Sequence, residues 1–286
     1  MELNRRDFLK VAGAGLGTLM LPSITAKAVS VVNDPDNAYA MLYDSNLCVG
    51  CRACQVACKK RSGLPYVTDE NHMYEMPTDL DGDTWTLIKL YQDEETFSYI
   101  KKQCMHCVAP ACASVCPVAA LEKTPQGPVV YHSYKCIGCR YCMTACPFDI
   151  PKYEWEEVNP IIQKCDFCAD LQAKGEQPAC SAVCPTGALI SGTRKEMLEV
   201  AHQRINDHPD QYFNHIYGEN EVGGTSMLYI SSLHYEKFGY PTLKDQPIPD
   251  ITWPYMKAVP FVFFGMAGAM SAIYYWTHRN QNEKED

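Results

Sequence analysis

Cysteine is the residue type whose number and spacing indicate chemistry in this chain of 286 residues. The sixteen cysteines fall into four groups of four, and neighbours within a group are separated by two, three, four or eleven residues. The groups, numbered one to four along the chain, are Cys48, Cys51, Cys54 and Cys58; Cys104, Cys107, Cys112 and Cys116; Cys136, Cys139, Cys142 and Cys146; and Cys165, Cys168, Cys180 and Cys184. Proline follows the fourth cysteine of each group except group one, where Lys59 follows Cys58. We therefore expect the helix after Cys58 to run differently from the others.

Three kinds of site compete for these cysteines. Disulfides are common in exported cysteine-rich chains, but eight bridges among cysteines so closely spaced would close unusually short loops. Zinc sites use pairs of cysteines two residues apart, but they need only two pairs for each ion. Cysteines separated by two residues, with a fourth cysteine followed by proline, are typical of bacterial ferredoxins, in which thiolates bind [4Fe–4S] clusters. The spacing favours four such clusters.

The backbone around these cysteines must form tight loops and short helices. A loop lets three thiolates of a group surround one cluster, and the fourth cysteine, one helical turn later, points to a neighbouring cluster. Gly50 and Gly138 leave out a side chain where the backbone approaches the cluster sulfur. We therefore expect an α+β fold that is built around the cysteine groups.

The segments between the groups predict further elements. Residues 84–91 are rich in β-forming residues, which predicts a hairpin in the insertion 59–103 between groups one and two. Thr193 and Glu196 match a capping box at the start of a helix that is expected to serve packing. Residues 207–252 show little periodicity, so we expect them to wrap the body or to contact a partner.

The N-terminus has the layout of an export signal. Arg5 and Arg6 precede an apolar run at 11–21, and Ala26-Lys27-Ala28 matches a cleavage site. Paired arginines at this position are typical of twin-arginine signals. The run is too short to span a bilayer, which disfavours a membrane anchor. The sequence predicts a twin-arginine signal peptide at 1–28, with cleavage after Ala28.

A second apolar run lies near the C-terminus. Residues 258–276 carry no formal charge, and as a helix they would rise about 28 Å, which is close to the thickness of the hydrocarbon core. Aromatic residues stand at both ends of the run, and Lys257 and Arg279 bracket it. The alternative is a buried core helix. We expect a transmembrane anchor at 253–278 and a cytoplasmic tail at 279–286.

Composition and missing motifs exclude other functions. The net charge of −9, without a long basic run, argues against nucleic acid as a partner. The chain has no nucleotide-binding glycine loop and no nucleophile elbow. We therefore expect no catalytic residues and no enzyme activity of the chain on its own.

The cysteine pattern and several short sequence segments around it resemble those of one protein family. The chain is similar to the four-cluster electron-transfer subunits of respiratory oxidoreductases, and within them to the branch that serves hydrogenase-2. The segments that carry this resemblance are Met41–Asp44, Cys48–Cys51, Tyr99–Cys107 and Gly138–Met143, together with the signal peptide and the anchor.

The resemblance implies a polyferredoxin of two nested bacterial-ferredoxin-like modules in residues 29–252. Groups one and four would pair, and groups two and three would pair inside them. Four ligand sets follow: a first set of Cys48, Cys51, Cys54 and Cys184; a second set of Cys58, Cys165, Cys168 and Cys180; a third set of Cys104, Cys107, Cys112 and Cys146; and a fourth set of Cys116, Cys136, Cys139 and Cys142.

The resemblance also implies a function. One partner would be a periplasmic [NiFe]-hydrogenase with its small and large subunits, and the other an integral membrane quinone-reactive subunit. Electrons would pass between these two partners through four [4Fe–4S] clusters. The chain would lie on the periplasmic face of the bacterial inner membrane as a single-pass protein with a cytoplasmic C-terminus. The same relay for formate dehydrogenase or a molybdopterin reductase is the alternative, and a structural zinc or disulfide protein is a more distant one.

Overall fold

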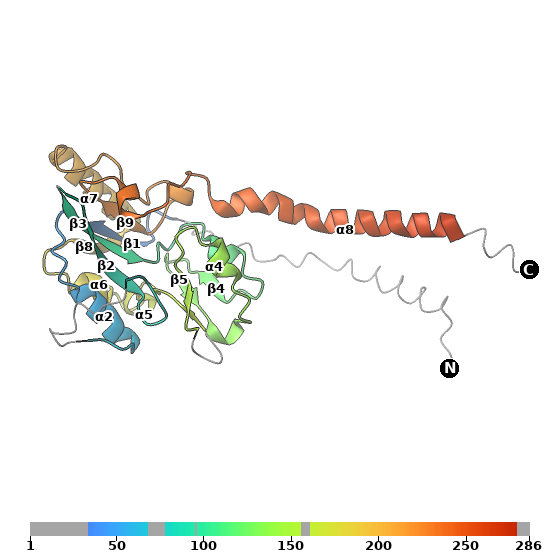
Figure 1. The fold of residues 1–286 in the computed structure, drawn as a ribbon, viewed down its shortest axis with the longest axis horizontal. Coiled ribbons are helices and arrows are strands. Elements are labelled where there is room, and N and C mark those ends of the chain that lie inside the picture. The colour runs from blue at the N-terminus through green and yellow to red at the C-terminus, as the bar shows by residue number, and fades with distance from the viewer. Residues whose placement is uncertain (1–33, 68–77, 95, 156–160, 279–286) are drawn as a thin grey trace, which may run out of the picture.

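The computed structural model describes residues 34–67, 78–94, 96–155 and 161–278. Short helices and small sheets form a body, from which one long helix departs (Figure 1). This mixed helix and strand content agrees with the predicted α+β class. The predicted signal peptide, with Arg5, Arg6 and the cleavage site after Ala28, and the predicted tail 279–286 lie outside the described residues.

The central sheet has three strands in the order β8-β1-β9. β1 (Tyr39–Asp44) pairs antiparallel with β8 (Leu189–Thr193) and parallel with β9 (Met227–Ile230). β1 is buried from Ala40 onward, and all of β9 is buried, because both faces of the sheet are covered. Parallel strands that are covered on both faces consist of continuous apolar runs without alternation. This is why β9 shows no alternation that would mark it as a strand within residues 207–252.

Helix α7 (Arg194–Asp207) covers one face of this sheet. Its Met197, Ala201 and Ile205 join a core cluster with residues of β1 and β9. The predicted capping box is confirmed: the Glu196 N–H donates to the Thr193 hydroxyl at 3.3 Å, and the Thr193 N–H donates to the Glu196 carboxylate at 2.9 Å. The opposite face of the sheet meets the cysteine groups.

The insertion between groups one and two contains the predicted hairpin. β2 (Thr86–Gln92) pairs antiparallel with β3 (Phe97–Gln103) over the full length of both strands. Helix α2 (Ala53–Ser62) contacts β2. The hairpin therefore ends directly at group two and also lies against the helix of group one.

Short elements carry the remaining cysteines. Helix α2 has 10 residues and continues past Cys58, whereas the other helices of the cysteine groups have 4 or 5 residues, which agrees with the absence of a proline after Cys58. The shorter helices are α3 (Ala111–Ser114), α4 (Tyr141–Ala145), α5 (Ala169–Gln172) and α6 (Ala179–Ala182). β4 (Leu121–Lys123) pairs with β5 (Val129–Tyr131) in one small sheet, and β6 (Lys152–Tyr153) pairs with β7 (Ile162–Gln163) in another. Single 3₁₀ turns lie at η2 (Ser133–Lys135), η3 (Glu221–Gly223) and η4 (Tyr235–Phe238).

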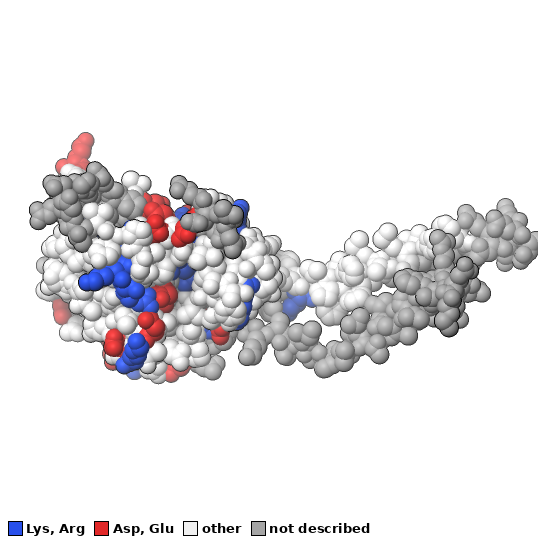
Figure 2. Space-filling model, turned by 90° about the horizontal axis from the view of Figure 1, so that it is seen from below, with Lys and Arg blue, Asp and Glu red and all other residues white. Residues whose placement is uncertain are grey.

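The long helix α8 (Ile248–His278) has 31 residues, none of them buried. By length and composition it is a candidate membrane span, which agrees with the predicted apolar C-terminal helix. Most of its surface carries no charged side chains (Figure 2). It contacts α3, and it leaves the body on the side that carries α4, β4 and β5, away from α2 (Figure 1).

Candidate metal centres

All four cysteine groups share one loop conformation. The second residue after the first cysteine has a positive φ in each group: 68° at Gly50, 47° at His106, 69° at Gly138 and 61° at Phe167. In three groups the N–H of this residue donates to the first cysteine Sγ, at 3.5 Å for Gly50 to Cys48, 3.4 Å for Gly138 to Cys136 and 3.4 Å for Phe167 to Cys165. Hydrogen bonds from amides favour the charged form of a thiol. The repeated loop is therefore suited to hold thiolates.

A second turn recurs after the fourth cysteine of groups two, three and four. The third residue after that cysteine has a positive φ: 51° at Ala119, 50° at Asp149 and 66° at Gly187. This turn returns backbone amides toward the thiol, with the Ala120 N–H 3.1 Å from Cys116 Sγ and the Leu189 N–H 3.4 Å from Cys184 Sγ. The proline in these groups stops the helix before the turn, because it cannot continue the helical hydrogen bonds.

The two glycines of these loops allow a matched test. Gly50 and Gly138 have nearly the same φ, but a Cβ at Gly50 would overlap the ring of Tyr99, whereas a Cβ at Gly138 would have no neighbour within 4 Å. We expect Gly138→Ala to cost about 1–2 kcal/mol through its left-handed backbone alone. Gly50→Ala should cost at least about 1 kcal/mol more, because the added Cβ overpacks the site.

Thermal unfolding of both variants under anaerobic conditions measures this difference. The Gly138→Ala variant is the control for the backbone effect. Equal losses of stability would show that the contact between the Gly50 loop and Tyr99 does not constrain the loop.

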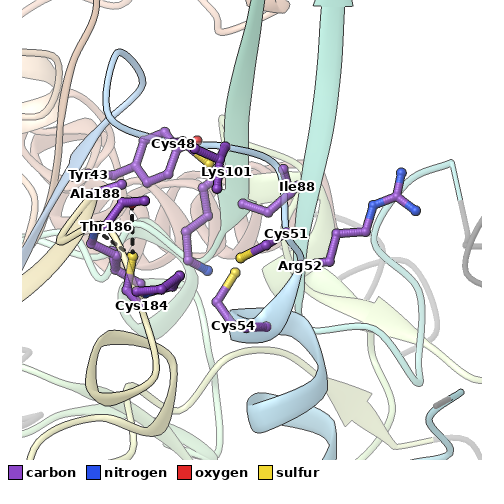
Figure 3. Close-up of a pocket in the computed structure, with 14 residues that line it drawn as sticks. Tyr43, Cys48, Cys51, Arg52, Cys54, Ile88, Lys101, Cys184, Thr186 and Ala188 are labelled. Atoms are coloured by element: carbon purple, nitrogen blue, oxygen red, sulfur yellow. Dashed lines mark hydrogen bonds between the residues drawn. The ribbon is translucent and has the colours of Figure 1, made fainter. Parts of the chain in front are cut away.

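The structure brings cysteines of groups one and four together. Cys48, Cys51, Cys54 and Cys184, the predicted first set, line one pocket. Their thiols surround this pocket, and Lys101 projects into it from strand β3 (Figure 3). Helix α2 and the turn after α6 therefore contribute to one site although they lie far apart in the chain.

The remaining cysteine of group one lies beside group four. Burial, with the nearby Cys180 and Cys168, raises the pKa of Cys58 to about 12, although Lys101 acts in the opposite direction. Burial also raises the pKa of Cys165, with Cys58 as the next cause. These four residues are the predicted second set.

Groups two and three are connected in the same way. Burial raises the pKa of Cys107, and the causes that follow are Cys146, Cys112 and Cys104, the other members of the predicted third set. Burial, together with Cys116 and Cys136, raises the pKa of Cys142 to about 11. Tyr153, whose pKa burial raises, lies near Cys142, Cys136 and Cys139, so the fourth set is also gathered in one region.

The four sets follow one another in a row. Burial is the largest cause of the raised pKa of Cys54, Cys165 and Cys112, and a cysteine of the adjacent set adds to each shift, namely Cys180, Cys104 and Cys142 respectively. Only Cys51 in the first set and Cys139 in the fourth set are exposed. The two exposed thiols therefore belong to the two end sets of the row, and all four thiols of the second set are buried.

The chemistry of these sets fits a cuboidal cluster better than the alternatives. All sixteen cysteines are free thiols, so the structure contains none of the eight disulfides. Within the described residues no three Cys, His, Asp or Glu side chains are close enough to hold a single metal ion, as a zinc site would require. The donors are thiols, which are the ligands of [4Fe–4S] clusters. The assignment of individual ligands stays a prediction.

Buried cations lie between the sets. Lys101, Lys123 and Lys164 are at most 5% exposed. Lys164 donates to the carbonyl of Cys165 at 2.9 Å, and Lys123 donates to the carbonyl of His106 at 3.0 Å. Burial and the two lysines Lys164 and Lys123 hold the pKa of His106 well below its usual range, so its ring is neutral. Neither Lys123 nor the burial of these lysines was predicted from the sequence; Lys101 and Lys123 lie in strands β3 and β4, and only such strand positions could have indicated that their side chains face inward.

Comparison with known proteins adds independent information. The sequence profile of the 4Fe-4S dicluster domain matches residues 95–194, which contain groups two, three and four. The chain is 38% identical to the hydrogenase-2 operon protein HybA of Escherichia coli O157:H7, over 85% of this chain and 85% of HybA. The chain belongs to this family of iron–sulfur subunits. The resemblance read from the sequence is thereby confirmed.

The family also contains formate dehydrogenase subunits. The nitrate-inducible formate dehydrogenase iron–sulfur subunit of E. coli K12 is 38% identical over 70% of each chain, and the formate dehydrogenase iron–sulfur subunit of Haemophilus influenzae is 33% identical over 86% of this chain and 82% of that subunit. The chain is thus an iron–sulfur electron-transfer subunit of the hydrogenase or formate dehydrogenase type. Membership is consistent with a non-catalytic subunit that binds [4Fe–4S] clusters and partner oxidoreductase subunits.

Proposed function

We propose that the chain relays electrons through four [4Fe–4S] clusters between a [NiFe]-hydrogenase and a membrane quinone-reactive subunit. The observation that carries this proposal is the row of four thiol sets, whose exposed thiols, Cys51 and Cys139, belong to the two end sets. Each bound cluster supplies the ability to take up and pass on one electron. The chain itself would hold the sets in sequence, leave no exposed thiol in the two middle sets and offer one set with an exposed thiol to each partner.

The position of α8 supports an assignment of the two ends. α8 contacts α3, which carries Cys112 and leads to Cys116 of the fourth set. The fourth set is therefore the end that would face the membrane subunit. The aromatic and aliphatic side chains that surround its exposed end, here called the Cys139 surface, are 60–80% exposed: Tyr134, Ile137, Tyr141 and Trp155. Uncovered apolar side chains gathered at one place are typical of a protein contact.

The first set would then face the catalytic subunits of the hydrogenase. Its loop exposes Val49 by 59%, and Phe97 of the neighbouring hairpin by 69%. Phe97 stacks edge-on against Tyr99, with the ring centroids 6.2 Å apart, and Tyr99 lies against Gly50. An apolar surface thus extends from the hairpin to the loop of Cys51.

Identity and length of the match, taken together, favour hydrogenase over formate dehydrogenase as the partner. HybA is 38% identical over 85% of this chain, whereas the nitrate-inducible formate dehydrogenase subunit reaches 38% over only 70% of it, and the Haemophilus influenzae subunit covers 86% of it at only 33% identity. The predicted signal peptide together with the candidate span favours the same assignment. We place the body on the periplasmic face of the inner membrane, with α8 as the anchor and the C-terminus in the cytoplasm. Formate dehydrogenase remains the second candidate because of the 38% identity to its subunit.

The test begins with the metal content of the affinity-tagged chain, purified anaerobically from detergent-solubilised membranes. We expect about sixteen iron atoms per chain, four for each cluster. Stoichiometric zinc without iron would overturn the relay. Dye reduction by the co-purified complex, measured with hydrogen and separately with formate, identifies the partner. Activity with formate alone would keep the relay and replace hydrogenase by formate dehydrogenase.

A further inference from the structure

Two neighbouring lysines in strand β3 occupy opposite environments. Lys101 is completely buried, whereas the side chain of Lys102 is 28% exposed and its ammonium lies 2.9 Å from the Asp79 carboxylate. Successive side chains of a strand point to opposite faces, which explains this difference. The two positions carry the same charge on adjacent residues, but only Lys101 projects toward the thiols.

The ammonium group of Lys101 is held in place by two neutral side chains. It donates to Gln103 Oε1 at 2.6 Å and to Thr86 Oγ1, and Thr86 is the strand partner of Gln103. The same ammonium nitrogen lies in the pocket of the first set, among the thiols of Cys51, Cys54 and Cys184 (Figure 3). The neutral partners fix the position of the charge without compensating it.

The same lysine is also close to the second set. The thiols that act on Lys101 are Cys180, Cys54, Cys165 and Cys58, one from the first set and three from the second. Lys101 in turn acts on Cys54 and on Cys58, the two cysteines that helix α2 contributes to different sets. A single charge therefore lies between two predicted clusters.

A buried cation requires a negative partner. An isolated buried ammonium group costs several kcal/mol, and this cost is offset only by a nearby anion with good geometry. Among the residues that the structure describes, no carboxylate pairs with Lys101. A [4Fe–4S] cluster held by four thiolates carries a net negative charge. The two adjacent clusters can therefore supply the counter-charge that Lys101 lacks.

We propose that Lys101 is a shared counter-cation of the first and second clusters and raises the reduction potentials of both. This inference rests on the proposed function, because it assumes clusters in both sets. Reduction adds a negative charge to a cluster, and a fixed positive charge nearby stabilises the reduced form. Lys101 does not exchange electrons, so it is a positioning residue that acts through the clusters. The third set has its own buried cations, Lys123 and Lys164, near Cys112 and its neighbours.

The test uses Lys101→Met in the full chain, purified with its complex. A redox titration followed by electron paramagnetic resonance measures the midpoint potential of each cluster. We expect two of the four potentials to shift downward and the other two to stay in place. Lys102→Met removes the same charge from the adjacent residue, and it is the matched control that should leave all four potentials unchanged. Lys101→Arg keeps the charge and should restore the two potentials toward those of the wild type.

The outcomes separate this inference from the proposed function. A wild-type chain without about sixteen iron atoms fails the proposed function itself. The role of Lys101 is overturned if Lys101→Met keeps its full iron content and all four midpoint potentials stay unchanged. It is also overturned if Lys102→Met shifts the same potentials by an equal amount. Either outcome leaves the relay intact. If Lys101→Met does not retain its iron, Lys101→Gln, which removes the charge but can still form hydrogen bonds, provides the same measurement and is judged by the same criteria.

Discussion

Replacing Cys139 by serine is expected to remove one cluster and to stop electron flow to the membrane without affecting hydrogen oxidation. Cys139 is exposed at the end of the row and belongs to the fourth set, which faces the membrane in our proposal. Serine is a poor ligand for iron, so the iron content should fall from about sixteen to about twelve atoms per chain. Hydrogen-dependent quinone reduction should drop to the background rate, because the last step of the relay is lost. Dye reduction by hydrogen should keep its rate.

Iron analysis and the two activity assays on the same preparation measure these effects. Ile137→Ser is the matched control for iron content, because Ile137 lies in the same loop, is 64% exposed and is not a cysteine. It should keep about sixteen iron atoms. Unchanged quinone reduction in Cys139→Ser would contradict the position of the fourth set at the membrane end. Loss of dye reduction as well would mean that the chain is also needed to assemble the catalytic subunits.

Ending the chain before Ile248 is expected to move the protein from the membrane to the soluble fraction. No residue of α8 is fully buried, and Ile248 at its start packs only partly against the core cluster of the body, so the body depends little on the helix for its core. In a bilayer each Leu, Ile, Phe or Val at the centre of a span contributes about 0.3–0.6 kcal/mol to insertion. The truncated chain should keep about sixteen iron atoms and lose its membrane association.

Fractionation of cells that express the chain without partner subunits measures this effect, because a partner could otherwise hold the body at the membrane. The control ends the chain after His278, which keeps all of α8 and should leave the protein in the membrane fraction. A truncated chain that remains in the membrane without partners would contradict α8 as the anchor. Loss of iron on truncation would show that the helix contributes to the fold of the body.

Sequence patterns predicted the elements whose signals are local. The hairpin at β2 and β3 followed from a run of β-forming residues, and the start of α7 from Thr193 and Glu196, because both signals need only neighbouring residues. The third strand of the central sheet, β9, was not predicted. Its side chains are buried on both faces, so its sequence has no alternation that would distinguish a strand from other buried segments.

The sequence by itself determined the kind of chemistry. The spacing of sixteen cysteines is a local property of the chain, and thiols at such intervals suit the geometry of iron–sulfur clusters whatever surrounds them. The same holds for the C-terminal helix, since its length and composition alone make it a candidate span.

Only the tertiary structure decided how the groups are arranged. The proximity of Cys58 to Cys180, the row of sets and the burial of the second set depend on contacts between residues that are distant in the chain. The difference between Lys101 and Lys102 has the same origin. Their sequence context is nearly identical, but one side chain faces the thiols and the other faces Asp79, because the hairpin lies with one face against the cysteine groups. Charge and exposure around a cluster are properties of that packing, and they set how each cluster can act in the relay.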